Sequence, residues 1–141
     1  TLVMRLSDGA VVPGNARVDD AEKARRTAAY YEPYHQAVEA AIDSAISAGH
    51  PPAIVSIHSF TPLWRGTRRP WEIGILWDTD PRLAVPVIEA FRADTLLTVG
   101  DTEPYSGRLK GDTMYRHATT RGLSHALVEL RQDLIAEQPG Q

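Results

Sequence analysis

The sequence predicts an α/β fold, because short apolar runs typical of strands alternate with longer stretches of helical periodicity. The apolar runs cover residues 53–57, 72–77, 96–99 and 124–130. Helical patterns cover residues 20–49 and 81–93. The chain has 141 residues, the size of one ordinary domain, so we expect residues 1–141 to form a single domain.

Composition excludes several classes of site and partner. The formal net charge is -3 and the arginines form no long run, so we expect neither nucleic acid nor an anionic membrane as the main partner. The chain has no cysteine, which excludes disulfides and cysteine-bound zinc and leaves the five histidines and the acids as metal ligands. No apolar run approaches the ~20 residues of a membrane span and no signal pattern is visible, so we expect a cytoplasmic protein.

The first long helix is predicted to be interrupted. Asp19 or Asp20 can cap its free N–H groups, and the helical pattern runs to about Gly49. Pro33 lacks a backbone donor and clashes with the preceding turn. We therefore expect a kink or break near Glu32, with Pro33 starting a second helix.

The apolar run at residues 53–57 leads directly into a polar segment that begins with His58. This pattern is typical of a buried strand whose end faces a site. Ligands of open α/β sheets collect at the carboxyl ends of strands, so His58 is a candidate metal ligand or general base. The alternative is a structural histidine held by hydrogen bonds.

The loop after this strand carries three arginines between two tryptophans. Arg65, Arg68 and Arg69 lie between Trp64 and Trp71. Because a guanidinium presents a planar fork to carboxylates, this loop could bind an anionic substrate. An ordinary solvated loop is the alternative.

The remaining elements follow in order. After the second strand comes a helix between residues 81 and 93, whose regular part should begin near Val85 or Pro86 because proline is tolerated only in the first turn. Residues 96–99 are the third strand. The polar segment 101–122 is too long for a turn, and long loops in compact domains tend to be functional.

The last predicted strand carries a carboxylate, Glu129, between two aliphatic residues. Burying a carboxylate is unfavourable unless a cation or a hydrogen-bond donor meets it. One explanation is a structural ion pair with Arg131 or Arg116. The other is a metal site in which His58 binds the cation and Glu129 activates the bound water.

Six strings occur along the chain: VVPGN at 11–15, YYEPYH at 30–35, VSIHSFTP at 55–62, PWEIGILWD at 70–78, EPYSG at 103–107 and RGLSHALVELRQDLI at 121–135. In this order they resemble the N-formylglutamate amidohydrolase family over nearly the whole chain. The combination of VSIHSFTP, EPYSG and VELRQDLI is much more specific than any one string.

The resemblance implies a zinc hydrolase with a three-layer αβα architecture and a mixed sheet, phosphorylase/hydrolase-like, as in zinc carboxypeptidases and aspartoacylases. It implies cleavage of an N-acyl amide of an acidic amino acid. The namesake substrate, N-formyl-L-glutamate, would give formate and L-glutamate in a route of histidine degradation. By position, His58 resembles the family's second zinc-binding histidine, and Glu129 resembles its general base and proton shuttle.

The resemblance further implies one zinc ion as cofactor and a small N-acyl amino acid as the binding partner. Four arginines are candidates for binding the substrate's carboxylates, by charge and loop position only: Arg65, Arg68, Arg69 and Arg116. Tyr105 is a candidate donor of a hydrogen bond to the substrate or the oxyanion.

The sequence departs from the family pattern at its beginning. In the family, the first zinc ligands, a His and a Glu, and an Asn-Arg pair that helps to bind the substrate lie upstream of the residues present here. Catalytic zinc takes three protein ligands, and only His58 can be placed in this chain. We therefore expect a C-terminal part of the family's domain, incomplete as given, whose turn-rich residues 1–15 resemble the middle of a chain.

Two alternatives remain open. A homologue that lacks the upstream ligands could bind a small anion or a partner subunit without metal. A zinc enzyme could instead act on acetyl-aspartate-like or other acylated amino acids.

Overall fold

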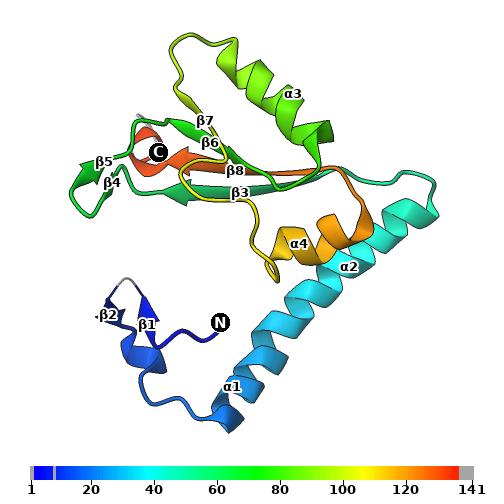
Figure 1. Cartoon of the computed structure of the whole chain (residues 1–141). Coiled ribbons are helices and arrows are strands. Elements are labelled where there is room, and N and C mark those ends of the chain that lie inside the picture. Colours follow the sequence, from blue (N-terminus) through cyan, green and yellow to red (C-terminus); the bar gives the residue numbers. More distant parts are fainter. Residues whose placement is uncertain (1, 8, 137–141) are drawn as a thin grey trace. The chain divides into compact units, whose positions relative to one another are not determined.

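The computed structural model describes residues 2–7 and 9–136 (Figure 1). The chain falls into two compact units, Thr1–Ala48 and Gly49–Gln141, and each is described by itself. Helices occur together with a sheet of parallel and antiparallel pairs, which confirms the predicted α/β class and the mixed sheet. The single domain stays a prediction.

A small hairpin and a 3₁₀ turn open the first unit. β1 (Leu6–Ser7) pairs antiparallel with β2 (Ala10–Val11), and η1 (Pro13–Asn15) follows. Asn15 Nδ2 donates to the carbonyl of Met4 at 2.8 Å. The turn-rich segment is therefore tied back onto the residues before the hairpin.

The rest of the first unit is helical, and it consists of α1 (Asp20–Arg26), a π-helical segment η2 (Thr27–Tyr31) and α2 (Glu32–Ser47). Asp19 caps α1, because its carboxylate accepts a hydrogen bond from the backbone N–H of Glu22 at 2.8 Å. Of the two predicted capping residues, Asp19 is therefore the one that is used.

A π-helical turn lies at the kink or break predicted near Glu32, and Pro33 is in the first turn of the second helix, α2, as predicted. Because helical residues precede it, Pro33 cannot donate a hydrogen bond to the turn before it. The N–H of Glu32 bonds to the carbonyl of Thr27, five residues back, which is the geometry of a π-helix. The helix thus accommodates the proline by widening before it rather than by ending.

The sheet of the second unit has four strands in the order β3 (Ile54–Phe60), β8 (His125–Arg131), β6 (Ile73–Leu76) and β7 (Val99–Asp101). β8 runs parallel to β3 and antiparallel to β6. A hairpin of β4 (Leu63–Trp64) and β5 (Thr67–Arg68) projects beyond the end of β3 (Figure 1). The carboxyl ends of β3 and β8 therefore meet at the end of the sheet that carries this hairpin.

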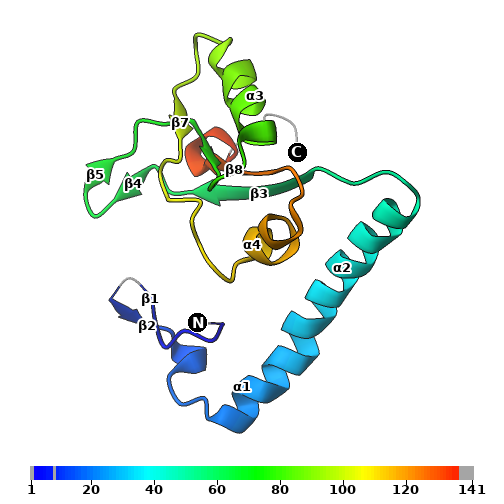
Figure 2. The same cartoon turned by 45° about the vertical axis from the view of Figure 1, so that its right-hand side comes forward.

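Helices lie on both faces of this sheet. Figure 2 shows α3 (Pro81–Arg92) on one face and α4 (Thr113–His117), followed by η3 (Thr119–Arg121), on the other; η4 (Gln132–Leu134) follows β8. The core lies between α3 and the sheet and consists of Ile73, Ile75, Ala84, Ile88, Ala126 and Val128. Among the described residues, no helix is long and apolar enough to cross a membrane.

The first strand differs from its prediction in two ways. β3 continues through His58 to Phe60, so His58 lies inside the strand and not at its end. Among the described residues β3 pairs only with β8, and Val55 and Ile57 are exposed. The prediction of a buried strand is therefore wrong, because an apolar run identifies a strand but not its position in a sheet.

The start of α3 also differs from its prediction. The helix begins at Pro81 and not near Val85 or Pro86. The reason is a cap: the carboxylate of Asp80 accepts the backbone N–H of Arg82 at 3.1 Å. Pro86 lies inside the helix, which continues past it. The Asp80 cap stabilises the part before Pro86, and the packing of Ile88 in the core stabilises the part after it.

The third strand and the long polar segment are further corrections. β7 covers Val99–Asp101 and not residues 96–99, because the N–H of Leu96 bonds to Asp94 Oδ1 at 3.0 Å in a turn. The segment 101–122 is not one long loop, since it contains α4 and η3.

Asp80→Ala should lower the free energy of unfolding by about 1 kcal/mol near neutral pH, because the cap of α3 and the ion pair with Arg82 are lost. The hydrogen bond from Arg82 lowers the pKa of Asp80 to about 2, below the ~3.9 of an unfolded aspartate. This stabilisation is therefore present above about pH 4 and lost as the pH falls through about 2. Urea unfolding of the full-length protein across this range measures it.

Asp80→Asn is the matched control. It keeps a side-chain oxygen for the N–H of Arg82 and removes only the charge, so its effect at neutral pH should be smaller. A loss for Asp80→Ala that stays constant down to about pH 2 would contradict the role of the ionised carboxylate.

Candidate functional site

A row of three residues crosses the sheet on the face opposite α3. The parallel register pairs His58 of β3 with Glu129 of β8, and the antiparallel register pairs Gly74 of β6 with the same Glu129. Directly paired residues point to the same face, and successive residues alternate. Because Val128 and Ile73 pack under α3, His58 and Glu129 point to the other face. The two residues that the sequence singles out are therefore neighbours.

Glu129 is a buried carboxylate with an unsatisfied oxygen. The residue is 5% exposed, and its Oε2 has no hydrogen-bond partner among the described residues. Oε1 lies 3.9 Å from Nδ1 of His58, whose side chain is 55% exposed. Burial raises the pKa of Glu129 above its usual range, while the charges of His58 and Arg69 act in the opposite direction. Such a carboxylate is typical of general bases.

Arg131 does not form the predicted structural ion pair with Glu129, so this choice of partner is wrong. Arg131 Nη1 lies 3.0 Å from Glu72 Oε1, and its Nε lies 2.7 Å from Asp133 Oδ1. Nη1 also donates to the carbonyl of Trp71 at 3.1 Å. Arg131 thus anchors the loop before β6 to β8.

The row is covered at Gly74 by the segment of residues 103–105. A Cβ at Gly74 would collide with the carbonyl oxygen of Glu103, and a Cβ at Gly100 would lie 2.8 Å from the Glu103 side chain. The two glycines let this segment lie directly on the sheet. Tyr105 is thereby brought to the same face as Glu129.

A groove of about 780 Å³ lies between the β4–β5 hairpin and residues 103–105. Its lining contains both loop tryptophans and all three loop arginines: Trp64, Arg65, Thr67, Arg68, Arg69, Pro70, Trp71, Glu103, Pro104 and Tyr105. Four of the five candidate substrate contacts therefore gather in one place. The fifth, Arg116, lies on α4 and does not line this groove.

Three further residues shape this region, Phe60, Arg131 and Gly74, and of these the sequence predicts a role only for Arg131, as an ion-pair partner of Glu129. Phe60 follows His58 by two positions and Arg131 follows Glu129 by two, so strand alternation puts each on the same face as its candidate. That spacing is the signal by which they can be found. Gly74 gives no such signal, because its lack of a side chain matters only through a segment distant in sequence.

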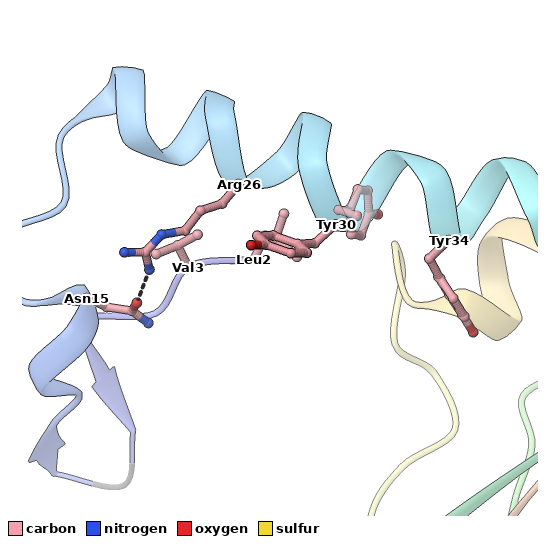
Figure 3. Close-up of a pocket in the computed structure, with 7 residues that line it drawn as sticks. Leu2, Val3, Asn15, Arg26, Tyr30 and Tyr34 are labelled. Atoms are coloured by element: carbon pink, nitrogen blue, oxygen red, sulfur yellow. Dashed lines mark hydrogen bonds between the residues drawn. The ribbon is translucent and has the colours of Figure 1, made fainter.

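The first unit has a hollow of its own, of about 370 Å³ (Figure 3). Tyrosines and aliphatic residues dominate its lining, which consists of Leu2, Val3, Asn15, Arg26, Tyr30, Tyr31 and Tyr34. Arg26 Nη1 donates to Asn15 Oδ1 at 2.8 Å, and its Nε bonds to Glu22 at 2.8 Å. The arginine is therefore already paired, and no carboxylate or imidazole lines this hollow, so the candidate chemistry lies in the second unit.

The residues present fit one part of a metal site. Among residues 2–7 and 9–136, no three His, Asp or Glu side chains group as a complete ligand set would. His58 is partly exposed and lies beside the unsatisfied carboxylate of Glu129, an arrangement that fits one metal ligand next to one base.

The chain matches the sequence model of a known family. The model of the family described as N-formylglutamate amidohydrolase matches residues 1–136. The chain belongs to the N-formylglutamate amidohydrolase family. The matched range contains both units, and with them His58, Glu129 and the groove.

A solved structure supports the fold of this member of the N-formylglutamate amidohydrolase family. The crystal structure of gene product Atu2144 from Agrobacterium tumefaciens is similar, with a TM-score of 0.85 and 39% sequence identity. The similarity covers 95% of this chain and 53% of that chain, so this chain spans about half the length of that protein. No curated protein matches the chain significantly.

Gly74→Ala should lower the free energy of unfolding by about 1–3 kcal/mol, because the added Cβ would push the carbonyl of Glu103 off the sheet. Thermal unfolding followed by circular dichroism measures the loss.

Gly14→Ala is the control, because no atom lies within 4 Å of a Cβ added there. It should stay within about 0.5 kcal/mol of the unchanged protein. Equal melting temperatures for the two variants would show that residues 103–105 do not depend on Gly74.

Proposed function

We propose that this chain carries the general base and one zinc ligand of an amidohydrolase that cleaves N-formyl-L-glutamate into formate and L-glutamate. Membership of the family supports amidohydrolase chemistry. The observation that carries the proposal is the buried Glu129, with an unsatisfied Oε2 and its Oε1 3.9 Å from His58 Nδ1. The zinc, this substrate and a three-layer αβα fold like that of zinc carboxypeptidases and aspartoacylases are parts of the proposal.

His58 is the proposed zinc ligand, through an imidazole nitrogen. When bound, zinc polarises an acyl carbonyl and lowers the pKa of water towards ~7. Among the described residues, His58 belongs to no cluster of three or more potential metal ligands. We therefore expect the remaining zinc ligands outside the described residues.

Glu129 is the proposed proton carrier. Its carboxylate takes a proton from the attacking water while the water oxygen bonds to the acyl carbon, and it gives the proton to the amide nitrogen while the C–N bond breaks. A carboxylic acid and a free amine result. Burial supports this role, because a raised pKa makes Glu129 a stronger base than an exposed glutamate.

The groove between the β4–β5 hairpin and residues 103–105 is the proposed substrate site, although neither His58 nor Glu129 is among the residues that line it. Its volume of about 780 Å³ is within the range of pockets for small molecules. Arg65, Arg68 and Arg69 give its lining a positive charge, which suits an anionic substrate. Other acylated amino acids, such as acetyl-aspartate, would occupy the same groove, and kcat/KM for a panel of N-acyl amino acids would rank them.

Metal-free binding of a small anion or a partner subunit is the second candidate function. The observation that favours it is that the described residues contain no complete group of metal ligands. It predicts neither stoichiometric zinc nor hydrolysis in the purified full-length protein.

Glu129→Gln should lower kcat for N-formyl-L-glutamate by at least about 100-fold in the full-length protein, because the proton carrier is lost. Its melting temperature should stay equal or rise, since a neutral amide avoids the desolvation of a buried carboxylate. Steady-state kinetics and thermal unfolding measure the two effects. The control is Glu89→Gln on the exposed side of α3, and a Glu129→Gln variant as active as this control would refute Glu129 as the base.

Removal of metal by a chelator should abolish hydrolysis, and added zinc should restore it, because the proposed reaction needs a Lewis acid. His58→Ala should weaken zinc binding by more than about 100-fold, since the loss of an outer-shell partner alone weakens it by 10–100-fold. Metal analysis and zinc titration measure this. His50→Ala, in the exposed segment before β3, is the control, and full activity after chelation would favour a metal-free function.

A further inference from the structure

Of the three arginines that line the groove, one is buried. Arg69 is 7% exposed, whereas Arg65 and Arg68 are exposed. Arg68 is near enough to Asp133 to help lower the pKa of that carboxyl, so its charge is partly balanced. Arg69 is therefore the loop arginine that the fold holds inside.

Three aromatic rings hold the guanidinium of Arg69. Its Cζ lies 4.9 Å from the ring centroid of Tyr105, 5.0 Å from that of Trp64 and 5.6 Å from that of Phe60. Cation–π contacts of this kind stabilise a desolvated guanidinium but leave its charge in place. The side chain is thus fixed in position while it remains positively charged.

Arg69 has no ion pair within the part of the chain that the structure describes. The carboxylate on which the charge of Arg69 acts is that of Glu129, whose pKa burial raises and Arg69 acts to lower. The hydrogen bonds of Arg69 run from Nη1 to Thr61, at 3.3 Å to the carbonyl and 3.4 Å to the hydroxyl. A buried guanidinium with no carboxylate in direct contact is unfavourable, so an incoming anion that contacts Arg69 would be stabilised there.

The position of Arg69 connects the groove to the proposed base. Arg69 lines the groove, and its positive charge acts to lower the pKa of Glu129. A substrate that extends from Glu129 into the groove would meet Arg69 in its lining. A guanidinium offers two parallel N–H groups to a carboxylate, and the edge formed by Nε and Nη2 makes no hydrogen bond to the described residues.

We propose that Arg69 binds a carboxylate of the substrate, with its guanidinium oriented in advance by Phe60, Trp64 and Tyr105. The inference rests on the proposed function, and it assigns the anionic group of the substrate to one of the three loop arginines. Because the rings already hold the side chain, binding loses little side-chain entropy. Arg69 thereby selects charged over neutral acyl amides, and Tyr105 contributes its ring rather than its hydroxyl.

Calorimetric titration of the full-length protein with glutarate and with glutaramide tests this assignment. Glutarate carries the carboxylates and cannot be hydrolysed, and glutaramide is its uncharged counterpart. The unchanged protein should bind glutarate on the order of 10- to 100-fold more tightly, and Arg69→Met should remove this preference. Arg92→Met, an exposed arginine at the end of α3, should keep it.

Conservative variants distinguish the loss of this contact from a loss of folding. Arg69→Lys keeps the charge and the aliphatic stem but loses the planar fork, so it should retain only part of the preference. Tyr105→Phe keeps the ring and should retain all of it, whereas Tyr105→Ala should reduce it. In hydrolysis, Arg69→Lys should raise KM more than it lowers kcat, because the lost contact is made by the bound substrate as well as by the transition state.

Two results would overturn the assignment: an unchanged protein without a preference for glutarate, or an Arg69→Met variant that keeps the preference while circular dichroism shows it folded. The proposed function fails separately, if the unchanged protein hydrolyses no N-acyl amino acid. A protein without hydrolysis that loses its glutarate preference in Arg69→Met would disprove the reaction and uphold the anion site.

Discussion

The in-register pairing of β3 with β8 is the constraint on which the candidate site depends. Because His58 and Glu129 occupy directly paired positions, main-chain hydrogen bonds between the strands fix how far the imidazole lies from the carboxylate. A slip of one residue would turn one of these side chains to the face that α3 covers. β6 holds β8 from its other side. The spacing of the two groups is therefore a property of the sheet and not of loops.

β8 carries two buried ionisable residues, of which one is paired with carboxylates and the other has an unsatisfied oxygen. Arg131 is bound by Glu72, Asp133 and backbone carbonyls, as a buried charge must be if it is to stabilise a fold. Glu129, two residues earlier and on the same face, keeps an unsatisfied oxygen. One strand thus contains both a structural anchor and a buried carboxylate with an unsatisfied oxygen, and such local departures from the rules of stable packing are typical of functional sites.

Most of the main sheet, His58 and Glu129 could be predicted from the sequence, because His58 directly follows an apolar run and Glu129 lies inside one. Their adjacency could not, since it depends on a register between strands that are far apart in the chain. The sequence also could not distinguish Arg69 from Arg68. The burial of Arg69 comes from rings on separate segments, Tyr105 among them, and neighbouring arginines look alike until those segments meet.

The place of β8 in the sheet has a consequence for evolution. A strand with a neighbour on each side opens only in large unfolding events, whereas short hairpins with exposed backbone open in small ones. Glu129 lies on such a central strand, and the β4–β5 hairpin that lines the groove consists of two-residue strands. Sequence drift in the hairpin can therefore change the lining of the groove while Glu129 stays where the sheet holds it.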